Sequence, residues 1–168
     1  MNMINMTELK GLSIKNILTL NPDQVQEYWQ KLYMDDLLDD RLCDLENPTW
    51  SDVLDMVAKI GKDIYHLLEN GRIVAEFTLE NQTGAAAQIH FSMHPDNTLR
   101  QSLNYAEYAI QYIFANSSIE TLYGLTPYTN RTACLFALKA GFKKIGILPR
   151  GIKHNGAVVD AMISMRTQ

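Results

Sequence analysis

The chain has 168 residues, of which 46% are hydrophobic and 20% are charged, and its formal net charge is −4. These values are typical of a soluble globular protein and predict one domain over residues 1–168. The acidic balance argues against broad nucleic-acid binding, and no hydrophobic run approaches the length of a membrane span. Cys43 and Cys134 lack metal-site spacing, so we expect two free thiols, no bound metal and a cytoplasmic protein.

Residues 1–61 are expected to contain a strand followed by two helices. The run Leu12–Leu20 is β-prone, and Asn21-Pro22-Asp23 then has the composition of a helix start. Asn21 is the cap, Pro22 suits the first helical position, and Asp23 favours the positive end of the helix dipole. We expect this helix to extend towards Leu38.

A second helix is expected over Thr49–Gly61. Thr49 and Asp52 have the spacing of a capping box, in which each residue bonds the backbone or side chain of the other. The expected apolar face of this helix consists of Val53, Leu54, Val57 and Ile60.

The hydrophobic period then changes from helix-like to strand-like. Asp63–Leu68, Arg72–Leu79 and Ala85–Met93 are three β-prone runs. Asn70-Gly71 is a strong two-residue hairpin signal, and residues 81–84 form a second turn signal. The sequence therefore predicts an antiparallel meander of three strands.

A long helix is expected over Leu99–Asn116, after a break at His94–Thr98. Tyr105, Tyr108 and Tyr112 form a stripe that we interpret as packing at the helix margin rather than as a cofactor site. The expected buried stripe consists of Leu103, Ala106, Ile110, Ile113 and Phe114.

A strand, a capped helix and a glycine stop follow. The strand is expected over Ile119–Thr126, and Asn130 is a good N-cap for the next helix. Gly141 lies where a helix ends in a left-handed residue, and Phe142 begins the next element. One apolar helix face is expected to contain Ala133, Phe136, Ala137 and Ala140.

The chain is expected to end in a hairpin of Lys143–Leu148 and Ala157–Met165, joined by a loop over Pro149–Gly156. The complete pattern predicts an α/β (α+β) fold with a mixed, mostly antiparallel sheet of six to seven strands, flanked by helices. The long helix makes a central, right-handed β-α-β crossover between two neighbouring strands.

The spacing of Asn130, Ala133, Gly141 and Phe142 resembles the late motif of the GNAT superfamily of N-acetyltransferases. The closing hairpin, with Asn155-Gly156 and Asp160, is similar to the hairpin found in the branch of this family that acetylates protein N-termini. The resemblance extends from about Lys62 to the C-terminus. It implies a core sheet with the cofactor cleft in residues 62–168, and a strand and helical pair near the acceptor cleft in residues 1–61.

The resemblance implies transfer of an acetyl group from acetyl-CoA to a primary amine, which is a protein N-terminus, a lysine or a small amine. The same resemblance places the cofactor against the last strand residue before the long helix, the turn that opens that helix, and the motif Asn. These residues are Met93, Leu99, Arg100, Gln101, Ser102, Leu103 and Asn130.

Several positions depart from the family pattern. The glycine positions of the pyrophosphate turn fall on Leu99, Gln101 and Leu103, although the helix N-terminus and Arg100 remain to attract an anion. In the alternative interpretation, Leu99 and Leu103 pack the helix onto the sheet. The family's acid positions, a Tyr and in one branch a Ser, fall on Ala137 and Ala133.

His90 is the candidate general base, because an unperturbed histidine titrates near neutral pH. It shares a strand face with Gln88 and Ser92, whereas the family's base lies on the other face, so a bulge would be needed to turn it. The alternative is a half-buried structural histidine.

Two functions therefore stay open. One is an active N-acetyltransferase; the other is a GNAT fold kept for a structural or binding role, for example as a phage-encoded or virion protein, since fold alone does not establish chemistry. We expect a monomer or a homodimer. An acidic segment fits either function, as a solvated loop or as a surface that attracts a cationic acceptor. Its members are Asp35, Asp36, Asp39, Asp40, Asp44 and Glu46.

Overall fold

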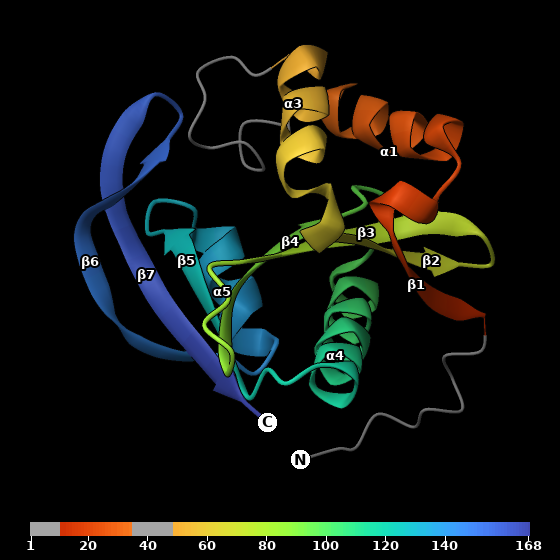
Figure 1. The fold of residues 1–168 in the computed structure, drawn as a ribbon. Helices are drawn as coiled ribbons and strands as arrows, with labels where there is room; N and C mark the ends of the chain where they lie inside the picture. Colours follow the sequence, from red (N-terminus) through yellow and green to blue (C-terminus); the bar gives the residue numbers. More distant parts are fainter. Residues whose placement is uncertain (1–10, 35–48) are drawn as a thin grey trace.

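A seven-stranded sheet with helices on both faces makes up the part of the chain that the computed structural model describes, residues 11–34 and 49–168 (Figure 1). The strands are β1 (Leu12–Asn16), β2 (Ile64–Glu69), β3 (Arg72–Glu80), β4 (Ala86–Met93), β5 (Thr121–Pro127), β6 (Lys143–His154) and β7 (Ala157–Thr167). The helices are α1 (Pro22–Met34), α3 (Trp50–Ile60), α4 (Leu99–Asn116) and α5 (Arg131–Lys139), with 3-10 turns η2 (Ile17–Thr19) and η3 (Gly61–Asp63).

The sheet has the order β1-β2-β3-β4-β5-β7-β6, and β4 and β5 are its parallel pair. Every other neighbouring pair is antiparallel. The predicted mixed sheet, the meander β2–β3–β4 and the β4–α4–β5 crossover are therefore confirmed. The Asn70-Gly71 turn is also confirmed, since both residues have positive φ angles of 51° and 86°.

The helix starts follow the sequence signals. Asn21 Oδ1 accepts the N–H of Asp23 at 2.9 Å, and the N–H of Thr49 donates to Asp52 Oδ2 at 2.7 Å. The prediction that Leu54 belongs to the buried face of α3 is wrong, because its side chain is exposed. The predicted extension of α1 towards Leu38, and the six clustered carboxylates, lie outside the described residues.

The predicted first strand is too long. The chain leaves the sheet after Asn16, whose Oδ1 accepts the N–H of Leu18 at 3.1 Å and thereby caps η2. The amide nitrogen of Asn16 also donates to the carbonyl oxygens of Gly61 and Ile64, at 3.1 and 3.0 Å. These distant partners fix the turn, and the sequence contains no local signal of them.

The predicted loop over Pro149–Gly156 is also wrong. Strand β6 continues to His154, and a two-residue turn at Asn155-Gly156 joins it to β7. The register shifts between Leu148 and Ile152, where Arg150 has a φ of 51° and donates its N–H to Asp160 Oδ1 at 2.9 Å. A side chain from the partner strand thus holds an irregularity that the sequence suggests is a loop.

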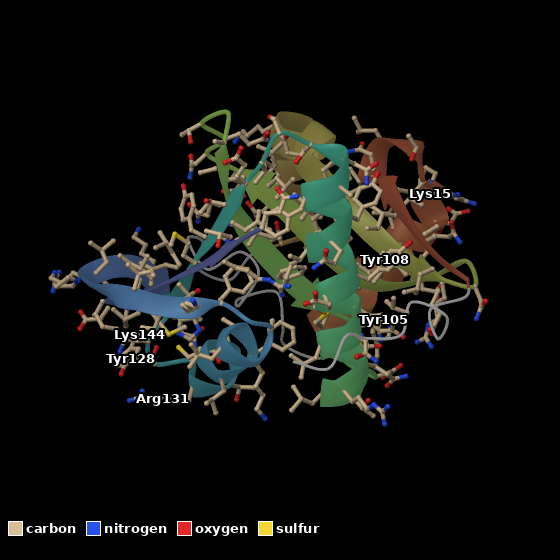
Figure 2. All side chains as sticks on the ribbon, turned by 90° about the horizontal axis from the view of Figure 1, so that it is seen from below. Lys15, Tyr105, Tyr108, Tyr128, Arg131 and Lys144 are labelled. Atoms are coloured by element: carbon tan, nitrogen blue, oxygen red, sulfur yellow. The ribbon has the colours of Figure 1, made fainter. Side chains whose placement is uncertain are left out.

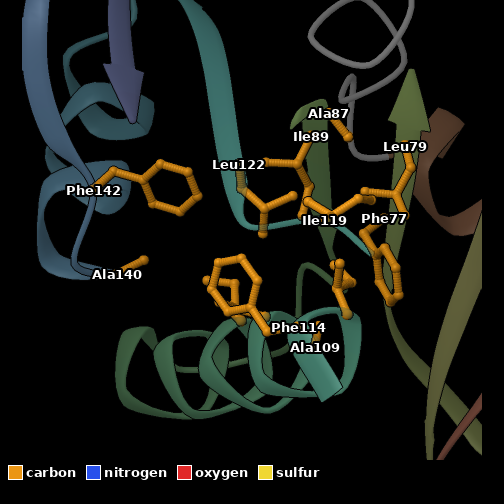
Figure 3. Packing of buried hydrophobic residues seen from close by; sticks show 13 residues of the cluster. Phe77, Leu79, Ala87, Ile89, Ala109, Phe114, Ile119, Leu122, Ala140 and Phe142 are labelled. Carbon is orange, nitrogen blue, oxygen red and sulfur yellow. The ribbon is translucent and has the colours of Figure 1, made fainter. Parts of the chain in front are cut away.

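The larger core lies between the sheet and α4, and Figure 3 shows its side chains meeting from β3, β4, β5 and α4. Phe77, Ile89 and Leu122 come from three neighbouring strands, and Phe114 reaches them from the helix. Of the tyrosine stripe, Tyr105 is buried rather than marginal, and its hydroxyl donates to Glu69 Oε2 at 3.0 Å.

The opposite face of the sheet carries α1 and α3 over a second core (Figure 1). Trp29, Leu32 and Val53 are buried there. This face also buries two polar cross-strand neighbours, because His66 Nε2 lies 3.1 Å from Glu76 Oε2 and both side chains are fully buried.

Candidate functional site

The sheet opens between its two parallel strands. Strand β4 pairs with β5 only over Ala86–Gln88, opposite Thr121–Tyr123. Beyond those residues β4 stays paired with β3 as far as Met93, and β5 stays paired with β7 as far as Pro127. Each strand therefore follows its antiparallel neighbour, and the two halves of the sheet part.

A cleft of about 260 Å³ occupies the opening. Its walls come from β4, from β5 and Asn130 after it, from α5 and the segment between α5 and β6, and from one residue of β7. They are Ile89, His90, Phe91, Ser92, Met93, Gly124, Leu125, Thr126, Pro127, Asn130, Ala133, Phe136, Ala137, Ala140, Phe142 and Ser164. Because consecutive residues of β4 face opposite sides of the sheet, the cleft borders both sides.

One wall of the cleft is the predicted apolar face of α5. Ala133, Phe136, Ala137 and Ala140 all line it, and the three small alanine side chains leave room beside β5. Asn130 begins the helix as predicted, and its Oδ1 accepts the N–H of Ala133 at 3.0 Å. Gly141 ends it with a φ of 85°.

Cys134 lies on the same helix but does not line the cleft. The thiol is buried, and its Sγ lies 3.6 Å from the carbonyl oxygen of Pro127. Burial raises the pKa of the Cys134 thiol. The described wall of the cleft therefore presents no thiolate as a nucleophile.

His90 reaches the cleft without the predicted bulge. The register between β3 and β4 is unbroken from the Ala75–Met93 pair to the Glu80–Gln88 pair. Since β4 has no partner on its β5 side beyond Gln88, the residues of both its faces border the open edge. The half-buried His90 is among them.

A chain of polar side chains orients His90. Its Nε2 lies 2.9 Å from Gln88 Nε2 and 3.6 Å from Glu80 Oε2. Asn81 Nδ2 donates to Gln88 Oε1 at 2.9 Å, which turns the Gln88 amide nitrogen towards the ring. A neutral His90 accepts from that nitrogen, and a protonated His90 has the Glu80 carboxylate beside it.

The start of α4 is closed by its own capping box. Thr98 Oγ1 accepts the N–H of Gln101 at 3.3 Å, and Gln101 Oε1 accepts the N–H and hydroxyl of Thr98 at 2.9 and 2.8 Å. The N–H of Ser102 donates to the carbonyl oxygen of Thr98. An approaching anion therefore meets two first-turn N–H groups, those of Leu99 and Arg100.

The predicted cofactor residues thus fall into two groups. Met93 and Asn130 line the cleft with His90, whereas none of the described residues Leu99–Leu103 does. The proposal that Leu99 packs the helix onto the sheet is wrong, since its side chain is 51% exposed. Leu103, in contrast, packs against the larger core.

Sequence reasoning missed Gly124 and Ser164, which are paired neighbours on β5 and β7 and both line the cleft. A Cβ atom at Gly124 would lie 3.5 Å from Ser164 Oγ and 3.8 Å from the carbonyl oxygen of Ile89. An isolated glycine inside a strand is a signal for close approach of a ligand or backbone. Ser164 has no comparable signal.

The fold is an α/β fold whose sheet opens between its two parallel strands, with a cleft in the opening. A family model described as an acetyltransferase (GNAT) domain matches residues 49–163, more than half of the chain. The chain therefore belongs to the GNAT acetyltransferase family. No curated protein matches the sequence significantly.

Solved structures show the same fold at low sequence identity. RimJ from Mycobacterium smegmatis, in complex with CoA-disulfide, has a TM-score of 0.76 and 13% identity over 93% of this chain and 81% of its own. Spermidine N-acetyltransferase from Vibrio cholerae, in complex with CoA and spermine, has a TM-score of 0.71 and 14% identity over 94% and 96%. RimL, a ribosomal L7/L12 α-N-protein acetyltransferase, has a TM-score of 0.76 and 11% identity over 95% and 91%.

Within residues 11–34 and 49–168, no helix is both long enough and apolar enough to cross a membrane. The same residues contain no group of three or more His, Cys, Asp or Glu side chains placed to hold a metal ion.

Proposed function

We propose that the protein transfers an acetyl group from acetyl-CoA to a primary amine. The observation that carries this proposal is the cleft between the parted strands β4 and β5, which borders both sides of the sheet. Such an opening suits a slender acyl chain that enters from the α4 and α5 side and presents its end to the other side. Membership of the GNAT family supports the same reaction.

The residues of the cleft suit the pantetheine arm better than the diphosphate. Ala133 and Ala137 leave space along α5, and the exposed edge of β4 up to Met93 can bond an amide-bearing chain. At the start of α4, Arg100 supplies a positive charge, and the N–H groups of Leu99 and Arg100 supply two donors. The arm would thus be held firmly and the diphosphate weakly.

In this proposal, His90 accepts at Nε2 the proton that the attacking amine loses. The Gln88 amide nitrogen, a donor, then gives up its hydrogen bond to that atom, and the protonated Nε2 faces the Glu80 carboxylate. The amine nitrogen forms a bond to the thioester carbonyl carbon, and the carbon–sulfur bond breaks. Acetyl-CoA supplies the acetyl thioester and leaves as a thiolate, whose pKa of about 8.5 makes acid help dispensable. Ala137 in place of a family tyrosine is compatible with this step.

The alternative function is a GNAT fold that binds or scaffolds without catalysis, for example in a phage or a virion. The capping box favours it, because Thr98 and Gln101 satisfy donors that an anion would otherwise receive. For the transferase, the proposed acceptor is a protein N-terminus, a lysine or a small amine.

Calorimetric titration with acetyl-CoA and with S-acetylpantetheine tests the proposal. We expect acetyl-CoA to bind with micromolar affinity and Asn130→Ala to weaken this binding. S-acetylpantetheine, which lacks the nucleotide, should bind less than about tenfold more weakly, because only two N–H groups and one arginine would hold the phosphates of the nucleotide. Arg100→Ala should affect acetyl-CoA alone, and Lys59→Ala on α3 serves as the charge-matched control. No heat and no thermal shift at millimolar acetyl-CoA would exclude the transferase and leave the binding role.

If the protein binds acetyl-CoA, the chemical step is tested with a panel of amine acceptors and a reagent that detects the free thiol of released CoA. His90→Gln should lower kcat by roughly a hundredfold, the lower end of general-base effects, while acetyl-CoA affinity stays unchanged. An unchanged kcat would refute the role of His90.

A further inference from the structure

The two parts of the chain have opposite charge. Residues 121–168 contain seven Lys and Arg residues and one acid, Asp160, whereas the first 120 residues contain eight basic and eighteen acidic residues. The last 48 residues build β5, α5, β6 and β7. The overall charge of −4 therefore conceals a basic unit at one end of the sheet.

Two cations of this unit meet on one tyrosine. The Arg131 guanidinium lies 4.5 Å from the centre of the Tyr128 ring, and Lys144 Nζ lies 4.9 Å from it. Figure 2 shows the three side chains gathered beside α5, on the other side of α4 from Lys15, Tyr105 and Tyr108. Hydrogen bonding from Arg131 and the charge of Lys144 lower the pKa of the Tyr128 hydroxyl.

No carboxylate of the described residues forms an ion pair with either cation. Two like charges held at one ring repel each other, and the ring face offsets this repulsion only partly. A carboxylate that approached from solvent would meet Arg131, Lys144 and the Tyr128 hydroxyl together. The cluster therefore has the charge and the donors of an anion site.

The anion site continues into exposed aliphatic side chains. On α5, Arg131, Leu135 and Leu138 share one face, and the two leucines are 57% and 42% exposed. The residues that line the cleft lie on the other side of this helix by its 3.6-residue period. On β6, Ile145 follows Lys144 as an unpaired bulge residue and is 58% exposed.

We propose that this surface docks an acidic polypeptide segment that carries aliphatic side chains. The outer α5 surface, as we call it, consists of Tyr128, Arg131, Leu135, Leu138, Lys144 and Ile145. Carboxylates of the partner pair with the two cations, and its apolar side chains cover the leucines and Ile145. A nucleic acid fits less well, since three exposed aliphatic side chains gain nothing against phosphates and the rest of the chain is acidic. Docking does not depend on acetyl transfer.

The probe is a fluorescein-labelled helical peptide of about 18 residues, roughly five turns, with Leu on one face and Glu elsewhere. Fluorescence anisotropy without acetyl-CoA measures its Kd at low salt and at about 0.15 M salt. We expect saturable binding that R131Q/K144Q weakens by roughly tenfold and that L135S/L138S also weakens. The matched control K15Q/K59Q removes two exposed charges elsewhere and should leave Kd within about twofold.

Three probes keep the proposal falsifiable. A peptide of equal length that contains only Glu should bind more weakly than the Leu/Glu peptide. Equal Kd values would show that the exposed aliphatic side chains contribute nothing to binding, and this would overturn the proposal. Tighter binding of a single-stranded RNA oligonucleotide would overturn it in favour of a nucleic-acid site. If R131Q/K144Q stays folded and loses acetyl-CoA binding instead, the cluster belongs to the cofactor and the proposal fails. Absence of saturable peptide binding by the wild type also refutes it.

Discussion

A single arginine connects three elements around the cleft. Arg166 of β7 donates through Nη1 to Glu107 Oε2 at 2.6 Å and through Nη2 to Glu107 Oε1 at 2.8 Å, so the pair is bidentate. The same Nη1 donates to the carbonyl oxygen of Ala140 at 2.7 Å, at the end of α5. Glu107 belongs to α4, and Ala140 lines the cleft. Arg166 therefore fixes the distance between the two helices that flank the cleft.

We expect Arg166→Met to lower the free energy of unfolding by about 3 kcal/mol. The change keeps an apolar stem and removes three hydrogen bonds, two of them to a carboxylate, which are worth about 1.5–3 kcal/mol each when desolvated. The Arg166 and Glu107 side chains are 15% and 29% exposed, so solvent screens part of this sum. For a chain of this length, the melting temperature should fall by about 6–12 °C, measured by circular dichroism together with urea unfolding.

The pH dependence separates the ion pair from simple packing. Hydrogen bonding from Arg166 lowers the pKa of the Glu107 carboxyl in the folded protein. The stability that the ion pair contributes is therefore fully present above the ordinary carboxyl pKa, and it is lost as the pH falls through the lowered pKa. The difference between wild type and Arg166→Met should therefore shrink below about pH 4. Glu107→Gln is the matched partner change for a double-mutant cycle. A loss below about 1 kcal/mol, or a difference that stays constant down to pH 3, would refute the reasoning.

Three further predictions concern other sites. An added Cβ at Gly124 meets no atom closer than 3.5 Å, so Gly124→Ala should leave the fold intact. The larger Gly124→Leu, checked for folding by circular dichroism, should fill the cleft and abolish the heat of acetyl-CoA binding in calorimetry; undiminished binding would exclude this cleft. Glu76→Leu should lower the free energy of unfolding in urea by about 1–3 kcal/mol, because it leaves the buried His66 ring without its carboxylate neighbour, and Glu76→Gln should cost less. Burial and Glu69 raise the pKa of Tyr105 to about 12, so stability should fall between about pH 10 and 12 in the wild type and less in Tyr105→Phe; equal pH profiles would contradict this.

The sequence predicted those elements whose signals are local. Helix α4 begins and ends where expected, because Thr98 caps its first turn from the preceding position and the 3.6-residue stripe lies within the helix. Helix α5 is bounded by Asn130 and Gly141, whose capping geometry depends on a few neighbouring residues. Caps and two-residue turns need no distant partner, so they can be recognised before the fold is known.

The errors arose where a distant residue decides. Asn16 ends β1 because it bonds the carbonyl oxygens of Gly61 and Ile64, which are far along the chain. Arg150 stays within β6 because Asp160 of β7 accepts its N–H. Neither partner can be inferred from the residues beside the turn. Propensity alone therefore predicts a first strand that is too long, and it predicts a loop where β6 continues.

For the site, the sequence predicted the composition of one wall but not the opening itself. The apolar face of α5 was recognised from its spacing, and Asn130, Met93 and His90 do meet around the cleft. Strand alternation placed His90 on the face opposite to the family's base, but this argument holds only for a strand that is paired along both edges. Where β4 has lost β5, both faces border the opening, and a parity argument no longer selects one of them.

The opening follows from the order of the strands. Three residue pairs join β4 to β5, whereas β4 pairs with β3 and β5 with β7 along nearly their full lengths. Each strand therefore follows the twist of its antiparallel neighbour, and two twisted half-sheets can stay in contact only over a short distance. A cleft made in this way depends on backbone and topology rather than on particular side chains. The start of α4 differs, because its use as an anion site depends on which N–H groups are free, and the side chains of Thr98 and Gln101 decide that. In the proposed function, the start of α4 would therefore hold the diphosphate weakly, while the cleft that would take the acyl arm does not depend on those side chains.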